Sequence, residues 1–312
     1  MRSVSAILTT PPDARPIAAR EEWWARHCEV ARGVSRPIDV ATIGGFAADR
    51  LGYAFASGYQ AALRALVPDL PADRLASICV TERGGGHPRA IETRLESIGE
   101  GRLKITGHKR WATLGDDSGL LLVVASTGTD ARGRNSLRVV RVDASLPGVK
   151  LRPMPEPPFT PEIAHDEIDL DGVIVSEGDV LPGDGFERYV RPFRTVEDLH
   201  VQAAVYAYAI REIRAHGLGT SLVERFAALL AALDPLAAAE PGAPAVHVAL
   251  AGVLALARGL FDELDRVWAK TESPAHARWE RDRLLLSVAS NAREQRLAKA
   301  WEALAGPSSS AQ

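Results

Sequence analysis

Two short stretches of this sequence hold residue types that could bind a flat ligand with polar edges. The first, residues 78–87, reads ICVTERGGGH, an apolar run that ends in threonine and glutamate and continues as three glycines. The second, residues 107–113, reads GHKRWAT and places Trp111 two residues before Thr113. A glycine loop lets a backbone approach a phosphate, and the Trp-x-Thr turn offers a flat surface beside a hydroxyl. Together the stretches predict a site for a flat, polar-edged heterocycle.

A sheet is expected to position these stretches. Residues 91–95 and 103–106, which lie between them, alternate in polarity as half-buried strands do. The alternation extends over residues 76–175, and glycines separate the short strands: Gly119, Gly128, Gly133, Gly148 and Gly172. This pattern predicts a compact antiparallel sheet or barrel.

Helical periodicity flanks the sheet on both sides. Before it, helices are expected over residues 18–33 and 46–66, after a leader with little periodicity. After it, helices are expected over residues 190–214, 220–233, 244–270 and 273–304, the last one opened by an N-cap serine and a proline. That last helix should carry a broad apolar stripe, formed by Trp279, Leu284, Leu285, Val288, Leu297 and Trp301.

Composition narrows the class of protein. The chain has 312 residues, of which 46% are hydrophobic and 25% charged, as in an ordinary soluble globular protein. A formal net charge of -3 gives no electrostatic reason to expect nucleic acid or an anionic membrane as a partner. We expect no apolar run of bilayer-spanning length, and the N-terminus lacks a signal-peptide core. The expected location is therefore cytoplasmic.

Neither a disulfide nor a metal site is predicted. Cys28 falls in a helical segment and Cys79 in a buried strand, so a bridge between them is not expected. The acidic run at residues 165–171 offers oxygen atoms that would suit calcium or magnesium. Because Ile168 and Leu170 alternate with the acids, a strand with one solvated face is favoured over a metal site.

The two ligand-binding stretches resemble the middle domain of the acyl-CoA dehydrogenase family. That family has a strand ending in Thr-Glu-Pro, then Gly-x-Gly-Ser-Asp, and later a turn Asn-Gly-x-Lys-x-Trp-Ile-Thr. Residues 79–82 and the series Gly107, Lys109, Trp111 and Thr113 fit these patterns at the right spacing. The match continues in order through the segments 120–127, 137–142, 147–149 and 168–185. It covers roughly half of the chain, and an ordered series is more specific than any single motif.

The resemblance implies an α+β fold of the acyl-CoA dehydrogenase type. The order would be a helical N-terminal region, a central antiparallel β-barrel-like domain and a C-terminal helical bundle. We divide the chain accordingly, as follows: a loose leader (1–17), a shortened N-terminal helical region (18–75), the central β-domain (76–184), the C-terminal helical domain (185–306) and a tail (307–312).

The resemblance also implies a flavin site. By position, Val80 and Thr81 would bond the pyrimidine edge of the FAD ring, Trp111 would pack against the ring, and Thr113 would bond near N5. These bonds matter because unpaired polar edges of a buried flavin cost free energy. The alternative is that Thr81 and Thr113 are ordinary strand residues and that Trp111 belongs to the core.

The sequence departs from the family pattern where FAD phosphates would bind. Arg83 replaces the proline of Thr-Glu-Pro, and His87 stands where the family has the serine that helps hold a pyrophosphate. Arg83 or His87 could meet that phosphate by charge. Two family motifs serve a neighbouring subunit's FAD: an arginine followed shortly by Phe-Gly after the long helix, and Gln-x-x-Gly-Gly. This chain reads RAHGLG at residues 214–219 in place of the first, and the second is absent. We therefore expect this chain alone to bind FAD weakly or not at all.

The expected function is removal of an α-proton and a β-hydride from an acyl thioester, linked to CoA or to a carrier protein. The family's usual C-terminal catalytic glutamate is missing, but some members place the base on the first helix after the β-domain, where Glu197 lies. Glu197 could equally be a solvent-facing acid. The alternative function is a catalytically incomplete subunit in a homo- or hetero-oligomer with an acyl-CoA dehydrogenase-like chain. The apolar residues 244–265 favour assembly through the C-terminal helices.

Overall fold

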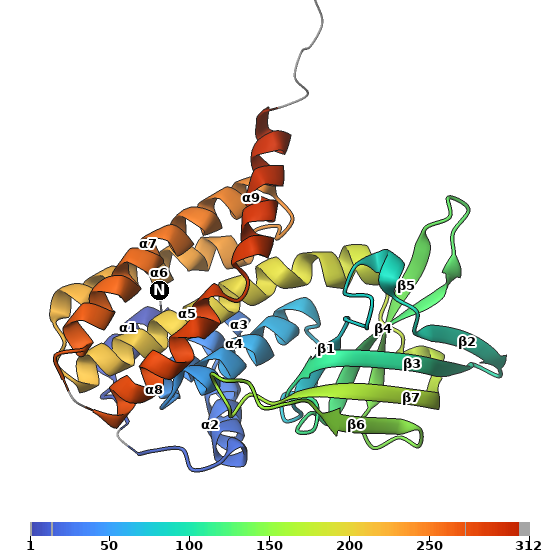
Figure 1. Ribbon diagram of the computed structural model, residues 1–312, viewed down its shortest axis with the longest axis horizontal. Coiled ribbons are helices and arrows are strands. Elements are labelled where there is room, and N and C mark those ends of the chain that lie inside the picture. The colour runs from blue at the N-terminus through green and yellow to red at the C-terminus, as the bar shows by residue number, and fades with distance from the viewer. Residues whose placement is uncertain (1, 14, 272, 306–312) are drawn as a thin grey trace, which may run out of the picture. The chain divides into compact units, whose positions relative to one another are not determined.

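A computed structural model describes residues 2–13, 15–271 and 273–305 of the chain. The expected tail, residues 307–312, lies outside them. The chain forms two compact units (Figure 1). The sheet unit comprises Leu66–Pro157 and Pro161–Arg194, and the helical unit comprises the residues up to Ala65, Pro158–Thr160 and the residues from Thr195 onward.

The sheet unit contains one seven-stranded sheet. Its strands are β1 (Ala76–Cys79), β2 (Arg94–Gly99), β3 (Arg102–Thr113), β4 (Leu120–Thr129), β5 (Asn135–Asp143), β6 (Val149–Pro153) and β7 (His165–Ser176). Their order is β1-β4-β2-β3-β7-β6, and β5 pairs with β4 on a separate edge. The expected strands are confirmed, but the sheet is mixed, because β1 and β2 both pair with β4 in parallel. The expected antiparallel pairing joins the other neighbouring strands, so the two parallel pairings of β4 are the departure from the expected antiparallel domain.

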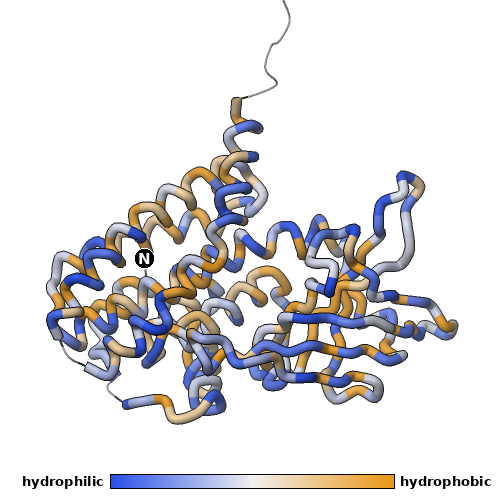
Figure 2. Tube along the Cα trace, in the orientation of Figure 1, coloured by the Kyte–Doolittle hydropathy of each residue, from blue (hydrophilic) through white to orange (hydrophobic). Residues whose placement is uncertain are grey.

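One face of the sheet encloses an apolar core. Along β3, Leu103 and Ile105 are buried while their neighbours are more exposed, as the alternation predicted. The same core takes in β4, where Leu121, Val123 and Ala125 are fully buried. Hydrophobic and hydrophilic residues are therefore interspersed along the strands (Figure 2). The opposite face of β2 and β3 is polar, and it becomes one wall of the cavity described below.

The helical unit is built around α5. Its helices are α1 (Arg2–Thr9), α2 (Arg20–Arg32), α3 (Pro37–Ala47), α4 (Leu51–Leu66), α5 (Arg191–Ala215, which starts in the sheet unit), α6 (Thr220–Ala238), α7 (Pro244–Trp268), α8 (Pro274–Asp282) and α9 (Ser290–Ala305). Every residue from 203 to 210 of α5 is buried. A helix buried on all sides forms the centre of a bundle, so α5 organises this unit.

Three helical expectations are corrected. The stretch expected to be a loose leader contains α1, whose Val4 and Ile7 are buried. The helix expected over residues 46–66 begins only at Leu51, and a separate helix, α3, precedes it. The single C-terminal helix is broken into α8 and α9 by a 3-10 segment at Arg283–Ser287.

Because of that break, the expected apolar stripe does not form. Trp279 is fully buried, whereas Leu284, Val288 and Trp301 are exposed. A continuous helix would have kept these residues on related faces, but the 3-10 segment changes the rotation from one residue to the next. The exposed apolar residues thus gather near the C-terminal end of the described chain.

Helix α7 corrects the expectation that no apolar run reaches bilayer-spanning length. Among the described residues, α7 alone is long and apolar enough to cross a membrane by length and composition, with 33% of its apolar window buried. The core helix of a soluble protein passes the same test. Its buried residues Val246, Leu250, Val253 and Ala257 recur at helical spacing, which is typical of a helix that packs on one side.

The crossing of α3 and α5 needs a glycine. A Cβ atom added to Gly45 would lie 2.1 Å from the carbonyl oxygen of Ala204. Because the clash is with backbone atoms, relieving it would require the helices to move apart. We expect Gly45→Ala to lower the free energy of unfolding by about 1 to 3 kcal/mol, as overpacking does. Denaturant titration would measure the effect. Gly252→Ala on α7 is the matched control, because nothing lies within 4 Å of its added Cβ. It should be neutral or stabilising by up to about 1 kcal/mol.

Candidate cofactor and substrate site

A buried ion pair organises the predicted ligand site. The Nζ atom of Lys109, on β3, lies 2.6 Å from Oε1 of Glu82, which follows β1. Their side chains are 0% and 7% exposed. Glu82 also accepts hydrogen bonds from the backbone nitrogens of Glu92 (2.8 Å) and Thr93 (3.1 Å) and from the Thr93 hydroxyl (2.8 Å). Burial acts to raise the pKa of Glu82, but attraction to Lys109 and these hydrogen bonds outweigh it and lower the pKa.

This pair ties the end of β1 to β3. Lys109 Nζ donates to the carbonyl oxygen of Val80 at 3.3 Å, and the Arg110 nitrogen donates to the carbonyl oxygen of Thr81 at 2.9 Å. The backbone of Val80 and Thr81 is therefore bonded to Lys109 and Arg110, the two residues before Trp111, although some thirty residues separate the two stretches along the chain. The sequence motifs include Glu82 and Lys109, but the ion pair between them was not predicted. No local signal distinguishes Lys109, because β3 carries several other basic residues, and Glu82 lies beyond the end of β1.

Trp111 is presented outward in a strained conformation. Its φ is 63°, in the left-handed region, and it lies in a β-bulge where the pairing of β3 with β7 shifts between Lys109 and Ala112. Its side chain is 53% exposed, so it is not a core residue. The ring contacts His165 edge-on, at 6.0 Å between centroids, and the Arg110 guanidinium lies 5.2 Å from the ring centroid. Such strain persists where it serves a site, and an exposed indole offers a platform for a flat ring.

The backbone around Trp111 brings the two expected ligand-binding stretches together. Thr81 and Thr113 are half-buried, and the two stretches are joined by the hydrogen bond between Arg110 and Thr81. The glycine loop lies beside Thr81, because a Cβ added to Gly86 would be in ordinary van der Waals contact with the Thr81 hydroxyl oxygen, at 3.4 Å. The structure thus brings Thr81 next to the Trp111 turn. That the side chains of Thr81, Trp111 and Thr113 share one pocket stays a prediction.

The glycine loop is less well suited to its expected role of binding the FAD phosphates. Arg83 and His87 are both exposed in the glycine loop, which is closed by paired hydrogen bonds between Glu82 and Gly85. His87 Nδ1 accepts a hydrogen bond from the Arg89 nitrogen at 3.2 Å and so caps a 3-10 turn, Pro88–Ala90. This ring nitrogen is engaged within the protein. Arg83 is the better suited of the two to meet a phosphate.

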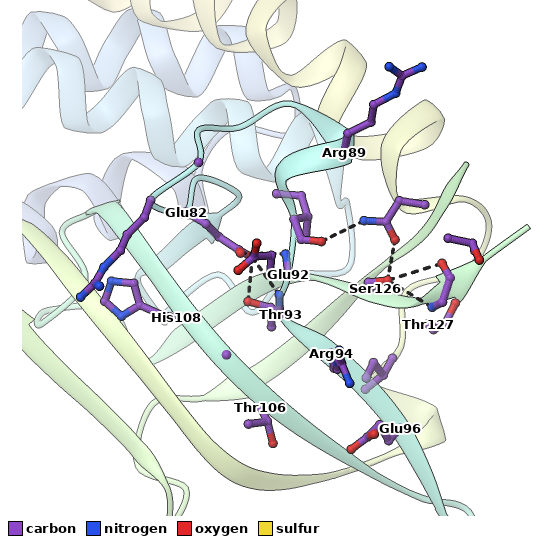
Figure 3. A pocket seen from close by; sticks show the side chains of 18 of the residues that line it. Glu82, Arg89, Glu92, Thr93, Arg94, Glu96, Thr106, His108, Ser126 and Thr127 are labelled. Atoms are coloured by element: carbon purple, nitrogen blue, oxygen red, sulfur yellow. Dashed lines mark hydrogen bonds between the residues drawn. The ribbon is translucent and has the colours of Figure 1, made fainter. Parts of the chain in front are cut away.

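A cavity of about 1430 Å³ lies beside this loop on the polar face of the sheet unit (Figure 3). It is lined by residues of the loop, of β2 and β3, and of the β4–β5 hairpin. Arg83 belongs to its wall, so the structure places this expected site residue in a cavity. Cationic and anionic side chains line it together with serine and threonine hydroxyls. A site of this composition suits a polar, charged ligand.

A histidine–aspartate pair in the same wall was also missed by sequence reasoning. His108 Nδ1 lies 2.8 Å from Oδ1 of Asp169, and this hydrogen bond is the largest cause that lowers the pKa of Asp169. Asp169 also lies 3.2 Å from Arg152. The acidic run that had suggested a metal is therefore a strand, β7, whose acids face basic residues of β3 and β6. No cluster of three or more potential metal ligands occurs among the described residues.

Glu197 lies in the helical unit, on the part of α5 that follows Arg194, and it is half-buried. Its neighbour Asp198 is buried and accepts hydrogen bonds from Arg293, at 2.8 Å, and from Arg296, both on α9. Asp198 is thereby committed to holding α9 against α5. The role of Glu197 as a base stays a prediction.

Comparisons with known proteins agree with this architecture. Residues 77–173 match the family model described as acyl-CoA dehydrogenase, middle domain. A comparison with curated proteins finds no match. The fold is similar to that of a glutaryl-CoA dehydrogenase from Mycobacterium smegmatis in complex with FADH2, with a TM-score of 0.65 and 15% identity over 99% of this chain and 95% of that one.

Two further solved structures show the same fold. Butyryl-CoA dehydrogenase from Megasphaera elsdenii has a TM-score of 0.65 and 15% identity over 92% of this chain and 90% of that one. A protein called FkbI, described as serving biosynthesis of the methoxymalonyl extender unit of the Fk520 polyketide, has a TM-score of 0.61 and 20% identity, over 90% of this chain and 88% of that one. The expected fold class is confirmed.

Proposed function

We propose that this chain is a flavin-dependent oxidoreductase of the acyl-CoA dehydrogenase type that acts on an acyl thioester, which the match of residues 77–173 to that family's middle domain and the shared fold support. The observation that supports this most is the arrangement around Trp111. A buried ion pair holds Val80 and Thr81 beside an exposed, strained tryptophan. A scaffold that fixes polar groups next to an open aromatic surface is what ring recognition requires.

In this proposal each residue has a separate task. Val80 and Thr81 bond the pyrimidine edge of FAD, Trp111 packs against the ring, and Thr113 bonds near its reactive nitrogen. Bound FAD would supply the acceptor for the β-hydride. Glu197 takes the α-proton as a general base. The location that we propose is the cytoplasm.

The alternative is a subunit that works beside a more complete relative, and one observation favours it. His87 stands in place of the family's phosphate-binding serine, and its Nδ1 is already engaged by the Arg89 nitrogen. Only Arg83 is then left in this loop to hold a phosphate by charge, so FAD binding by this chain alone is weak. A partner chain in the oligomer would supply the remaining phosphate contacts.

The flavin site is tested by replacing its aromatic platform. We expect Trp111→Ala to weaken FAD binding about tenfold to a hundredfold, because aromatic stacking of a flat ring contributes roughly 1 to 3 kcal/mol. Titration of the visible flavin spectrum with protein would measure the dissociation constant. Trp111→Phe keeps a flat ring and is the matched control, which should retain most of the affinity. Equal affinity of wild type and Trp111→Ala would exclude this role.

The reaction is tested by acyl-CoA oxidation with this chain alone and with Glu197→Gln. If Glu197 is the base, turnover should fall by about a hundredfold or more, because a positioned base contributes 10²–10⁴-fold to a rate. Glu224→Gln, an exposed glutamate of α6 in the same unit, should leave turnover unchanged. Turnover that survives Glu197→Gln would make Glu197 a surface acid, and turnover that requires an added full-length relative would favour the subunit alternative.

Assembly through the C-terminal helices is a further prediction. These helices carry exposed large apolar residues: Leu256 on α7, Leu284 and Val288 after α8, and Trp301 and Leu304 on α9. Such a concentration is typical of a surface that is covered in an assembly. We expect light scattering to show an oligomer that Leu256→Glu shifts toward monomer. Ile98→Glu, at an exposed residue of the sheet unit, is the control and should not change the mass. A wild-type monomer at micromolar concentration would contradict this prediction.

A further inference from the structure

We propose that the end of α9 inserts Trp301 into a cavity in the helical unit of a second copy of this chain, and that each copy receives the tryptophan of the other. This rests on the assembly through the C-terminal helices proposed above, because it names the residue that enters and the cavity that receives it. It goes beyond the flavin chemistry, which depends on other residues.

The receiving cavity lies between α5, α7, α9 and the 3-10 segment after α8. Its volume is about 590 Å³, within the roughly 300 to 1,000 Å³ of ordinary ligand pockets. Large apolar side chains form much of its wall: Leu254 and Phe261 on α7, Trp279 on α8, Leu286 in the 3-10 segment and Leu297 on α9. Charged side chains of both signs also line it. A cavity of this kind suits a bulky apolar group rather than an ion.

One polar group in this cavity lacks a partner. The Gln202 side chain, on α5, is only 4% exposed and lines the cavity. Within the described part of the chain, its amide forms no hydrogen bond. A buried amide without a partner costs free energy, so an occupant that supplies a hydrogen bond is favoured. An indole combines an apolar body with one N–H donor, and the Gln202 side-chain oxygen can accept from it.

The end of α9 carries an indole that its own chain leaves uncovered. Every residue from 301 to 305 is exposed, and this end of α9 stands clear of the other helices of its unit (Figure 1). Trp301 and Leu304 are 56% and 51% exposed. Trp301 lies about 6 Å along the helix axis beyond Leu297, the last residue of α9 that lines the cavity, and does not line it itself. Tryptophan is prominent among the residues that dominate interface affinity.

The position of Trp301 on α9 explains why the occupant is a second copy. Ser290, Glu294 and Leu297 line the cavity, and Trp301 continues their spacing of three to four residues, so the four residues form one stripe. An antiparallel pair of α9 helices with a twofold axis at Leu297 brings Trp301 of one copy level with the partner's Arg293, at the partner's cavity. Both insertions then form from the same surface on each copy, as a closed twofold dimer requires.

The first test is the dissociation constant of the dimer, measured on the full chain by analytical ultracentrifugation. We expect Trp301→Ala to raise this constant about thirtyfold or more for each inserted side chain, as the loss of a central tryptophan does. Trp301→Phe keeps an apolar ring but loses the N–H donor, so it should raise the constant about twofold to tenfold per side chain. Trp111→Ala removes a similarly exposed tryptophan, 53% against 56%, from the sheet unit. It is the matched control and should dissociate as wild type does.

The second test traps the proposed register and leaves Trp301 in place. In the double variant Ser290→Cys with Leu304→Cys, the two new thiols of one chain lie about 20 Å apart along α9, too far for a bond within the chain. Across the twofold axis, each faces the other position on the partner. Oxidation with copper phenanthroline should therefore give a covalent dimer. Each single variant should give little, and it also reports any bond through the native Cys28.

Three results would overturn the inference. They are an unchanged dissociation constant in Trp301→Ala, no excess of covalent dimer in the double cysteine variant over the single variants, and a wild type that by itself is monomeric at micromolar concentration. Dissociation by Leu256→Glu but not by Trp301→Ala would remove the insertion and leave assembly through the C-terminal helices in place. The flavin spectrum of the same samples tests the oxidoreductase function separately, because Trp301 has no part in ring binding.

Discussion

Replacing Lys109 with methionine is expected to lower the free energy of unfolding by about 3 to 5 kcal/mol, the usual effect of removing one partner of a buried ion pair. Methionine fills a similar volume, so the loss would come from the charge that remains on Glu82. That carboxylate is buried and would keep only its hydrogen bonds from Glu92 and Thr93. Denaturant titration of the variant and of wild type would measure the difference.

Two controls separate this effect from a general loss of charge. The double variant Lys109→Met with Glu82→Gln leaves no lone charge and should recover part of the stability. Lys104→Met lies on the same strand, and its pair with Glu96 is 3.2 Å long but about half exposed. Exposed pairs contribute about 0 to 1 kcal/mol, so this variant should change little. A Lys109→Met variant no less stable than Lys104→Met would show that the buried pair does not brace the site.

The same pair also couples stability to cofactor binding. Lys109 Nζ reaches the carbonyl oxygen of Val80, and the next residue, Arg110, bonds to Thr81. Loss of Lys109 should therefore weaken flavin binding even if the variant stays folded at low temperature. Trp111→Ala differs, because it removes the ring contact without disturbing the buried pair.

Much of this fold could be predicted from local patterns. Alternation along β3 and β7, and helical spacing in α5 and α7, follow from which residues must be buried. The parallel pairing of β1 with β4 could not be predicted in this way, because it joins strands more than forty residues apart and leaves no local signal. The break before α9 was missed because the segment Arg283–Ser287 is rich in leucine, a good helix former.

The candidate site, too, could be predicted only in part from the sequence. The motif residues Thr81, Trp111 and Thr113 were found from spacing, whereas their support by Glu82 and Lys109 depends on contacts across 27 residues. The cavity was not foreseen, because its wall combines a loop, two strands and a hairpin whose charges are paired only in three dimensions. Local sequence shows which residues are charged. It does not show which charges remain free.

The last prediction concerns the stability of the fold at acidic pH. We expect the free energy of unfolding to fall by about 1.4 kcal/mol for each pH unit between roughly 6.5 and 3, because of His27 alone. His27, on α2, is buried against Trp23 and Trp24, and its ring nitrogens form no hydrogen bond within the described chain. Burial first, and the nearby charge of Arg64 second, lower its pKa from 6.5 to about 3.

The sign follows from the proton count in the two states. In this pH range the unfolded chain binds a proton at His27 and the folded chain does not, so acid favours unfolding. His27→Phe keeps an aromatic ring without the titrating group. Its unfolding free energy, measured by denaturant titration at pH 7, 6 and 5, should therefore depend on pH less steeply than that of wild type. Some slope should remain, because burial also lowers the pKa of His200 to about 4. Equal slopes for the two proteins would mean that His27 gains a proton, and a partner for it, without unfolding.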